Sequence, residues 1–462
     1  MAKENRLPQG ENKMRTMPVG KLLFTMALPL AISMLVQAFY NIVDTYFVSQ
    51  VDADATGALS LAFPIQNLQI GFATGIGVGM NSLLSKSLGE GNRERANKAA
   101  GNGILLMLIA IGVFMLFGFF GTSAYYSLFN TNETARQYGI DYTTICCVFT
   151  GGIFIEILCE RLLQASGRTI YTMFTQGTGA ILNIILDPMF IFGFAPLGIP
   201  RMGVAGAAVA TVIGQWGAAI LGIIFNIFKN PDVKFGFRYL KPEKKVMSKI
   251  LGVGIPSIIM MGIGSVMNFG MNQVFLRFSQ TAVNVFGIYF KVQSLFLMPL
   301  IGINNASISI VAYNYGARQP KRIMTNMKYA LGAAFAVMLV GVAVFQLLPH
   351  KVMGIFEATD DMVKMGVTAM RIVSIHFLLA AIGIPMSASF QALGNGLYST
   401  IVSLCRQLVV LLPAAYLLAL SGSVDMVWWS FPIAEVVSST LCILLFIRIY
   451  KQKIKPLYQE QS

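Results

Sequence analysis

Long apolar stretches alternate with short polar connections along the whole chain. Each stretch approaches the ~20 residues that an α-helix needs to cross a bilayer core of ~30 Å. We therefore predict an all-α membrane protein with twelve transmembrane helices. The predicted spans are residues 22–48, 58–84, 104–121, 140–158, 171–194, 204–228, 250–275, 283–311, 330–348, 367–386, 397–420 and 426–449.

The composition agrees with this pattern. Hydrophobic residues make up 55% of the 462 residues and charged residues only 12%, about half the charged fraction of a soluble globular protein. The five cysteines all lie inside predicted spans, and their number is odd. We therefore interpret them as small apolar residues and not as disulfides or metal ligands. The first apolar run is too long for a cleavable signal and lacks a cleavage site.

The net charge of +14 is placed along the chain in a way that indicates topology. Most Lys and Arg residues lie in the two termini and the even-numbered connections, whereas the odd-numbered connections contain few of them and most of those connections are acidic or neutral. By the positive-inside rule both termini then face the cytoplasm. We expect a multi-pass protein of a bacterial cytoplasmic membrane that contacts lipid and binds no nucleic acid.

The chain also contains an internal repeat with a period of 227 residues and no gap. The matches include Pro29 with Pro256, Asn41 with Asn268, and Gln164-Ala165 with Gln391-Ala392. Many matched residues are Pro, Gly, Asn or Gln, which shared apolar composition does not explain. Six spans return the chain to the same side of the membrane, so the two copies are parallel and pseudo-symmetric.

The repeat divides the chain into two six-helix lobes. A cleft between two such lobes is where a transporter substrate binds, and rocking of the lobes gives alternating access. Pro29 and Pro256 lie inside the first span of each lobe, where proline removes a backbone hydrogen bond and bends the helix. The predicted segments are a cytoplasmic N-terminal segment (1–21), an N-lobe (22–228), a basic linker (229–249), a C-lobe (250–450) and a cytoplasmic tail (451–462).

Polar residues at membrane depth are functional candidates because an ionised side chain there costs about 2.5–3.5 kcal/mol even on a lenient scale. Asp44 and Asp187 both lie in the outer half of their spans, with Asn183 on the face of Asp187 and Thr211 at similar depth. Their oxygens can bind Na⁺, or the two carboxylates can share a proton. The alternative is that both acids are solvated at the outer interface.

Other polar residues are candidates for a substrate cavity. We include Gln37, Asn41, Glu156, Gln176, Asn268 and Asn272 in this group. Glu160 and Arg161 read as a paired cap whose charges reach the membrane surface. The roles of four further residues stay open, with structural pairing favoured: Lys291, His376, Arg406 and Glu435.

These motifs resemble the multidrug and toxic compound extrusion (MATE) family over essentially the whole chain. The resemblance rests on the parallel twelve-span repeat and on the strings Asn41-Ile-Val-Asp44-Thr45, Asn183-Ile-Ile-Leu-Asp187-Pro188 and Ala210-Thr211-Val-Ile-Gly-Gln215. It implies two lobes that export lipophilic, often cationic compounds against Na⁺ or H⁺ entry.

The resemblance also implies residue roles. Asp44, Asn183, Asp187 and Thr211 match the cation site of the family, Gln37 a substrate-contact position, and Pro29 the proline at which the first helix bends. The seventh span lacks the acid of NorM-type members and the tenth has none in its interior, so the chain is closer to bacterial DinF-like and MepA-like members. We expect a monomer with no cofactor besides the coupling ion.

Two other function classes share some of these features. A flippase for lipid-linked oligosaccharides or cell-wall precursors has the same lobe architecture, and Arg406 and Lys291 keep it open. An enzyme is disfavoured because the sequence shows no zinc-type His cluster, Ser–Lys dyad or paired catalytic loop. A P-loop is also absent, so transport should draw on an ion gradient and not on ATP bound by this chain.

Overall fold

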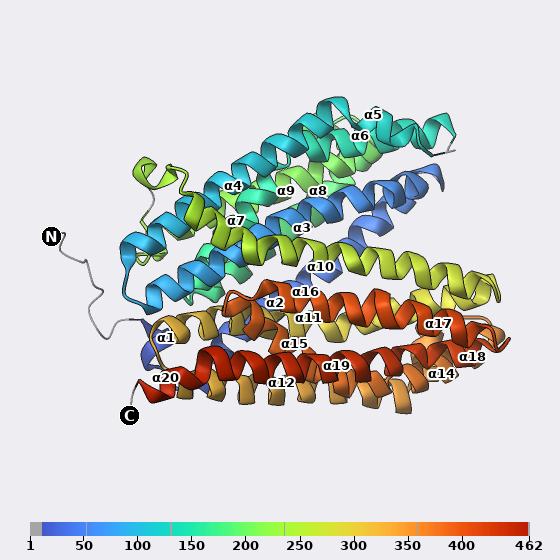
Figure 1. Ribbon diagram of the computed structural model, residues 1–462. Coiled ribbons are helices and arrows are strands. Elements are labelled where there is room, and N and C mark those ends of the chain that lie inside the picture. Colours follow the sequence, from blue (N-terminus) through green and yellow to red (C-terminus); the bar gives the residue numbers. More distant parts are fainter. Residues whose placement is uncertain (1–11, 52, 130–131, 235, 357, 461–462) are drawn as a thin grey trace. The chain divides into compact units, whose positions relative to one another are not determined.

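The computed structural model describes residues 12–51, 53–129, 132–234, 236–356 and 358–460. Within these ranges the regular elements are helices, apart from one isolated β-bridge between Phe194 and Ile199 (Figure 1). The chain forms two compact units. Unit 1 contains residues 32–258, and unit 2 contains residues 12–31 and 259–462.

Unit 1 is built around seven long helices. Its helices pack most extensively through the pairs α8 with α9, α7 with α9, and α3 with α4. Part of α2 and part of α10 also belong to this unit. The helices are α2 (Val19–Ser49), α3 (Ala53–Gly89), α4 (Arg93–Phe120), α5 (Thr122–Tyr126), α6 (Glu133–Val148), α7 (Gly151–Ala165), α8 (Thr169–Phe192), the 3-10 turn η1 (Ala195–Leu197), α9 (Val204–Lys229) and the 3-10 turn η2 (Phe237–Leu240).

Unit 2 repeats this arrangement with more interruptions. Its main helix pairs are α11 with α12, α12 with α15, and α15 with α19. The span that begins at Gly396 contains a π-helical segment, η3. The helices are α1 (Lys13–Thr16), α10 (Lys244–Leu276), α11 (Gln280–Gly316), α12 (Pro320–Leu347), α13 (Pro349–Ile355), α14 (Asp360–Val373), α15 (Ile375–Ala392), α16 (Gly396–Leu404), η3 (Cys405–Leu411), α17 (Leu412–Ala419), α18 (Val424–Trp428), α19 (Ser430–Ile449), the π-helical η4 (Tyr450–Ile454) and α20 (Lys455–Gln459).

The units differ from the predicted lobes at the first helix of each repeat. The chain passes from unit 2 to unit 1 after Ala31, inside α2, and from unit 1 to unit 2 after Ile258, inside α10. Each changeover comes two residues after a proline, Pro29 or Pro256, and both helices continue past it. The two positions are one repeat period apart. Residues 22–31 thus belong to unit 2, and the linker 229–249 together with residues 250–258 belongs to unit 1.

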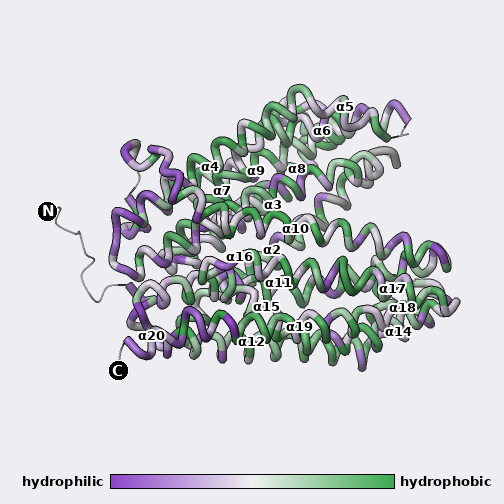
Figure 2. The backbone as a smooth tube through the Cα atoms, viewed as in Figure 1, coloured by the Kyte–Doolittle hydropathy of each residue, from purple (hydrophilic) through white to green (hydrophobic). Residues whose placement is uncertain are grey.

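Each of the twelve predicted spans coincides with a helix or with consecutive helices. Nine helices of the described residues are long and apolar enough to cross a membrane, and ten if α6 and α7, which meet at 46°, form one span. α3 and α8 do not reach that hydropathy, because polar side chains such as Gln66 and Asp187 interrupt them. Figure 2 shows apolar helix bodies with hydrophilic residues concentrated at connections such as α3–α4.

Candidate functional site

The site begins with the close contact of α8 and α9 in unit 1. A Cβ atom added to Gly214 of α9 would lie 2.8 Å from the carbonyl oxygen of Gly179 in α8, and one added to Gly206 would lie 2.4 Å from that of Phe190. Only glycine fits at these distances, and small residues are how transmembrane helices pack tightly. The two backbones are therefore close enough for short polar side chains to reach across.

Asn183 makes that connection. Its Nδ2 atom donates hydrogen bonds of 3.2 Å to Asp187 Oδ1, one turn later in α8, and of 3.2 Å to Thr211 Oγ1 in α9. All three side chains are buried, with exposed fractions of 3%, 0% and 6% respectively. The structure thus brings together three of the four residues that we predicted for ion coupling.

Three acceptor oxygens of the predicted set have no hydrogen-bond partner among the described residues. They are Asp44 Oδ1, Asn183 Oδ1 and Asp187 Oδ2, and all three atoms are buried. Asp44, on α2, is close enough to Asp187 for their charges to interact. Unsatisfied buried acceptors are costly unless a donor or cation satisfies them. We call Asp44, Asn183, Asp187 and Thr211 the acid site.

Tyr40 was not predicted from the sequence. It lies on α2 one turn before Asp44, and its electrostatic neighbours are Asp44, Glu156 and Asp187. A phenol can donate a hydrogen bond to a carboxylate and can also face an organic cation. The signal available was its spacing of four residues from Asp44, but a tyrosine in an apolar helix is usually a packing residue.

Glu156 and Glu160 have different surroundings within α7. Glu160 is buried and accepts hydrogen bonds from Gln176 Nε2 (3.0 Å) and Thr175 Oγ1 (3.4 Å) of α8. Arg161 is also buried, with 6% of its surface exposed, so Glu160 and Arg161 do not form the surface-reaching cap that the sequence suggested. Glu156 is half-buried, and its carboxylate lies near Gly179 of α8.

The other predicted cavity residues are spread over two helices. Gln37 is half-buried on α2 of unit 1, on the same helix as Asp44. Asn41 lies between them, and its side chain is outside the described residues. Asn268 and Asn272 are half-buried on α10 of unit 2. The described residues contain no group of three or more His, Cys, Asp or Glu that could hold a metal ion.

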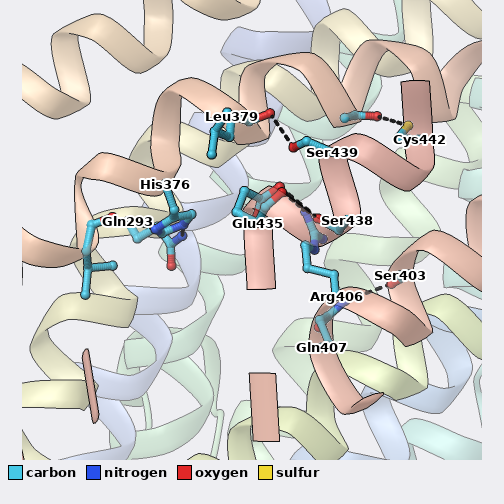
Figure 3. Close-up of polar contacts among 12 residues, drawn as sticks. Gln293, His376, Leu379, Ser403, Arg406, Gln407, Glu435, Ser438, Ser439 and Cys442 are labelled. Atoms are coloured by element: carbon cyan, nitrogen blue, oxygen red, sulfur yellow. Dashed lines mark hydrogen bonds and ion pairs between the residues drawn. The ribbon is translucent and has the colours of Figure 1, made fainter. Parts of the chain in front are cut away.

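Unit 2 contains a separate polar cluster between α15, η3 and α19 (Figure 3). Arg406 Nη1 lies 3.8 Å from Glu435 Oε1. His376 lies 3.2 Å from Gln293 Nε2 and contacts the Val373 carbonyl at 2.5 Å. His376 and Glu435 are both buried. Of the residues whose roles the sequence left open, three therefore meet in one region, and Lys291 is exposed on α11.

Comparison with known families decides the identity of this architecture. The MatE family model matches the chain twice, over residues 29–189 and 256–417. These two segments cover more than half of the chain and begin one repeat period apart. The chain belongs to the MatE family. This confirms the sequence resemblance, and it confirms the internal repeat independently of the residue matches.

Curated MATE relatives span nearly the whole chain. The multidrug export protein MepA of Staphylococcus haemolyticus is 25% identical over 428 residues, which cover 92% of this chain and 93% of that protein. MepA of Staphylococcus aureus strain MSSA476 is 26% identical over 434 residues, with 92% of each chain covered. A FAD transporter of Shewanella oneidensis is 25% identical, covering 94% and 95% respectively.

Solved MATE structures share the fold. A MATE transporter in complex with MaL6 superposes with a TM-score of 0.89 at 25% identity, covering 99% of this chain and 100% of that one. An outward-facing multidrug resistance MATE transporter of the MOP superfamily gives the same TM-score and identity. The predicted all-α MATE-like fold and the similarity to MepA-like members are thus confirmed. The protein is a multi-span membrane transporter.

Proposed function

We propose that this MATE protein is an ion-coupled efflux antiporter that exports lipophilic, often cationic compounds by alternating access. The observation that carries the proposal is the acid site, where three buried acceptor oxygens of α2 and α8 have no hydrogen-bond partner in the part of the chain that the structure describes. A protein keeps such oxygens at membrane depth when an ion satisfies them during its cycle. The relatives named MepA support multidrug export as the transport activity.

The coupling ion binds at the acid site in this proposal. Asn183 fixes Asp187 Oδ1 and Thr211 Oγ1 by hydrogen bonds, which leaves Asp187 Oδ2, Asn183 Oδ1 and Asp44 Oδ1 to face the ion. Oxygen ligands of this kind suit Na⁺, and a carboxylate pair equally suits a shared proton. Entry of the ion from outside provides the free energy for export of the drug.

Cationic substrates are attracted by the same unit. Glu156 and Tyr40 supply a carboxylate and a phenol next to the acid site, and a desolvated organic cation interacts favourably with both. Export requires the orientation that the positive-inside rule gives, with both termini in the cytoplasm of a bacterial cell. The chain is proposed to work as a monomer.

The test is transport by purified protein in liposomes. Ethidium movement is followed by fluorescence while a Na⁺ gradient or a pH gradient is imposed separately. One of the two gradients should drive transport, and Asp44→Asn and Asp187→Asn should each lower the gradient-driven rate at least tenfold. Asp141→Asn is the matched control, because Asp141 lies in the same unit but only bonds Gln137 at an exposed position.

Two results would contradict the proposal. Gradient-driven transport that is unaltered in both aspartate variants would place ion coupling elsewhere. Wild-type protein that moves no ethidium under either gradient, but moves a fluorescent lipid-linked diphosphate, would favour a flippase.

A further inference from the structure

Arg406 has an unusually weak ion pair for a charge in a membrane span. It lies near the middle of the candidate span Gly396–Ala419, yet its Nη1 atom is 3.8 Å from Glu435 Oε1, too far for a hydrogen bond. A guanidinium has five N–H donors and prefers bidentate carboxylate contacts of about 2.7–2.9 Å. Arg406 makes no other side-chain hydrogen bond or ion pair among the described residues, so its donors are largely unused.

The two members of the pair differ in accessibility. The Arg406 side chain is 32% exposed, whereas that of Glu435 is 6% exposed. Glu435 Oε1 is further held by the Ser438 hydroxyl at 3.4 Å and faces Gly383 of α15, where a Cβ atom would lie 4.0 Å away. Glu435 is therefore the fixed and buried partner. The Arg406 side chain reaches toward it from η3, as Figure 3 shows, and keeps 32% of its own surface exposed.

The backbone around Arg406 is also unusual. Residues Cys405–Leu411 form a π-helical segment inside an otherwise α-helical span. Such segments cost backbone stability and occur frequently at functional sites. The neighbouring Gln407 is held in place, because its Nε2 atom donates to Ser403 Oγ at 2.8 Å. Its Oε1 atom faces Gly264 of α10, where an added Cβ atom would lie 3.7 Å from it.

We propose that Arg406 is a binding site for an anionic group, a carboxylate or a phosphate, of the transported molecule. The anion accepts hydrogen bonds from the free guanidinium donors, while Glu435 keeps the arginine oriented and balances its charge when the site is empty. The compounds that this protein transports would then include zwitterions and anions as well as cations. The FAD transporter among the relatives acts on a molecule with phosphate groups. The proposal deepens the proposed function, on which it rests.

A structural ion pair is the competing explanation. Such a pair should have hydrogen-bonding distances and similar burial of both partners, because its gain must offset the desolvation of both charges. The 3.8 Å separation and the unequal exposure fit that explanation poorly. An anion that approaches the exposed guanidinium would gain charge-assisted hydrogen bonds that the glutamate does not use.

The test compares matched ligands that differ only in the anionic group. Binding to the purified full-length protein is measured by ligand fluorescence for ciprofloxacin against its methyl ester, and for flavin mononucleotide against riboflavin. The first pair probes a carboxylate and the second a phosphate. Arg406→Gln should weaken binding of the ligand that carries the anion at least tenfold and change its neutral-group counterpart less than twofold. Arg406→Lys should recover part of the loss, since it keeps the charge but not the fork geometry.

Two further variants keep the test decisive. Arg406→Gln alone leaves Glu435 buried without a countercharge, so the double variant Arg406→Gln/Glu435→Gln is measured as well and should show the same selective loss. Arg277→Gln is the matched control, because Arg277 is exposed and its guanidinium lies 4.7 Å from the centre of the Tyr416 ring. Equal losses for both members of a ligand pair, or no loss, would overturn the proposal. If gradient-driven ethidium transport fails while the anion selectivity holds, only the ion coupling proposed above is wrong.

Discussion

The same helix pair of the repeat carries opposite chemistry in the two units. In unit 1, α8 and α9 are joined by an amide, Asn183, that bonds a carboxylate and a hydroxyl and leaves acceptor oxygens free. In unit 2 the corresponding pair, η3 with α19, is joined by the long ion pair between Arg406 and Glu435, which leaves donors free. One unit is thus built to receive a cation and the other to receive an anion.

The units also differ at the positions that correspond to the two aspartates of the acid site. At the offset of 227 residues Asp44 corresponds to Met271 and Asp187 to Ala414. Met271 is fully buried in an aromatic core that includes Phe275, whose ring lies 4.3 Å from that of Trp428. The space that holds acids in unit 1 is filled with apolar side chains in unit 2. Ion coupling in one unit only is the arrangement that this difference favours.

A local change of backbone accompanies the change of chemistry. The segment Cys405–Leu411 is π-helical, whereas the matching part of α8 is regular α-helix. Single-turn π segments inside α-helices are frequent at functional sites. The two units therefore share the fold but differ in backbone conformation near Arg406.

The largest effect is expected when an acid is introduced into unit 2 at the position that corresponds to Asp44. Met271→Asp places a carboxylate in a buried aromatic core, so we expect a loss of at least about 3 kcal/mol of unfolding free energy. Thermal unfolding of the detergent-purified protein measures it. Met271→Leu, which conserves volume, should cost less than about 1.5 kcal/mol. If the aspartate variant is as stable as the leucine variant, unit 2 can hold a buried acid and the units are not specialised.

A second prediction concerns the close contact that holds the acid site together. Gly214→Ala forces a Cβ atom to within 2.8 Å of the Gly179 carbonyl and 3.4 Å of Asn183 Cβ, so α8 and α9 must move apart. We expect about 1–3 kcal/mol of destabilisation together with weaker gradient-driven transport.

The matched control for this change is in α8. Gly177→Ala meets nothing within 4 Å, so it should alter stability by no more than about 1 kcal/mol, in the stabilising direction. Equal transport by both alanine variants would show that the α8–α9 distance does not set the geometry of the acid site.

Much of this architecture could be predicted from the sequence. The all-helical fold, most of the spans and the repeat follow from hydropathy and from matched Pro, Gly, Asn and Gln residues, which do not depend on tertiary contacts. Asn183, Asp187 and Thr211 were grouped by helix spacing and common depth, and the structure brings them together. Polar residues in apolar helices are rare enough to be recognised one by one.

Other features depend on side-chain contacts that no single-helix pattern contains. The position of Tyr40 among three acids and the bonds of Glu160 to Gln176 and Thr175 join different helices. The passage of α2 and α10 from one unit to the other is defined by contacts between helices. The π-helical turn at Arg406 has no counterpart in α8, so the repeat did not predict it.

The smallest predicted effect comes from removing the hydrogen bond between α8 and α9. Thr211→Val keeps the side-chain shape but removes the Oγ1 atom that accepts from Asn183 Nδ2 at 3.2 Å. The amide then loses one of its two anchors and holds its own Oδ1 less firmly toward the ion. One such bond contributes about 1 kcal/mol, so we expect about five- to tenfold more of the driving ion for half-maximal ethidium transport in liposomes.

Thr211→Ser should restore the wild-type value. Ser439→Ala, which removes a hydroxyl bonded to the Leu379 carbonyl in unit 2, should leave the value unchanged. A shift of similar size in Ser439→Ala would mean that loss of any buried hydroxyl has this effect, and that the asymmetry between the units does not extend to ion affinity.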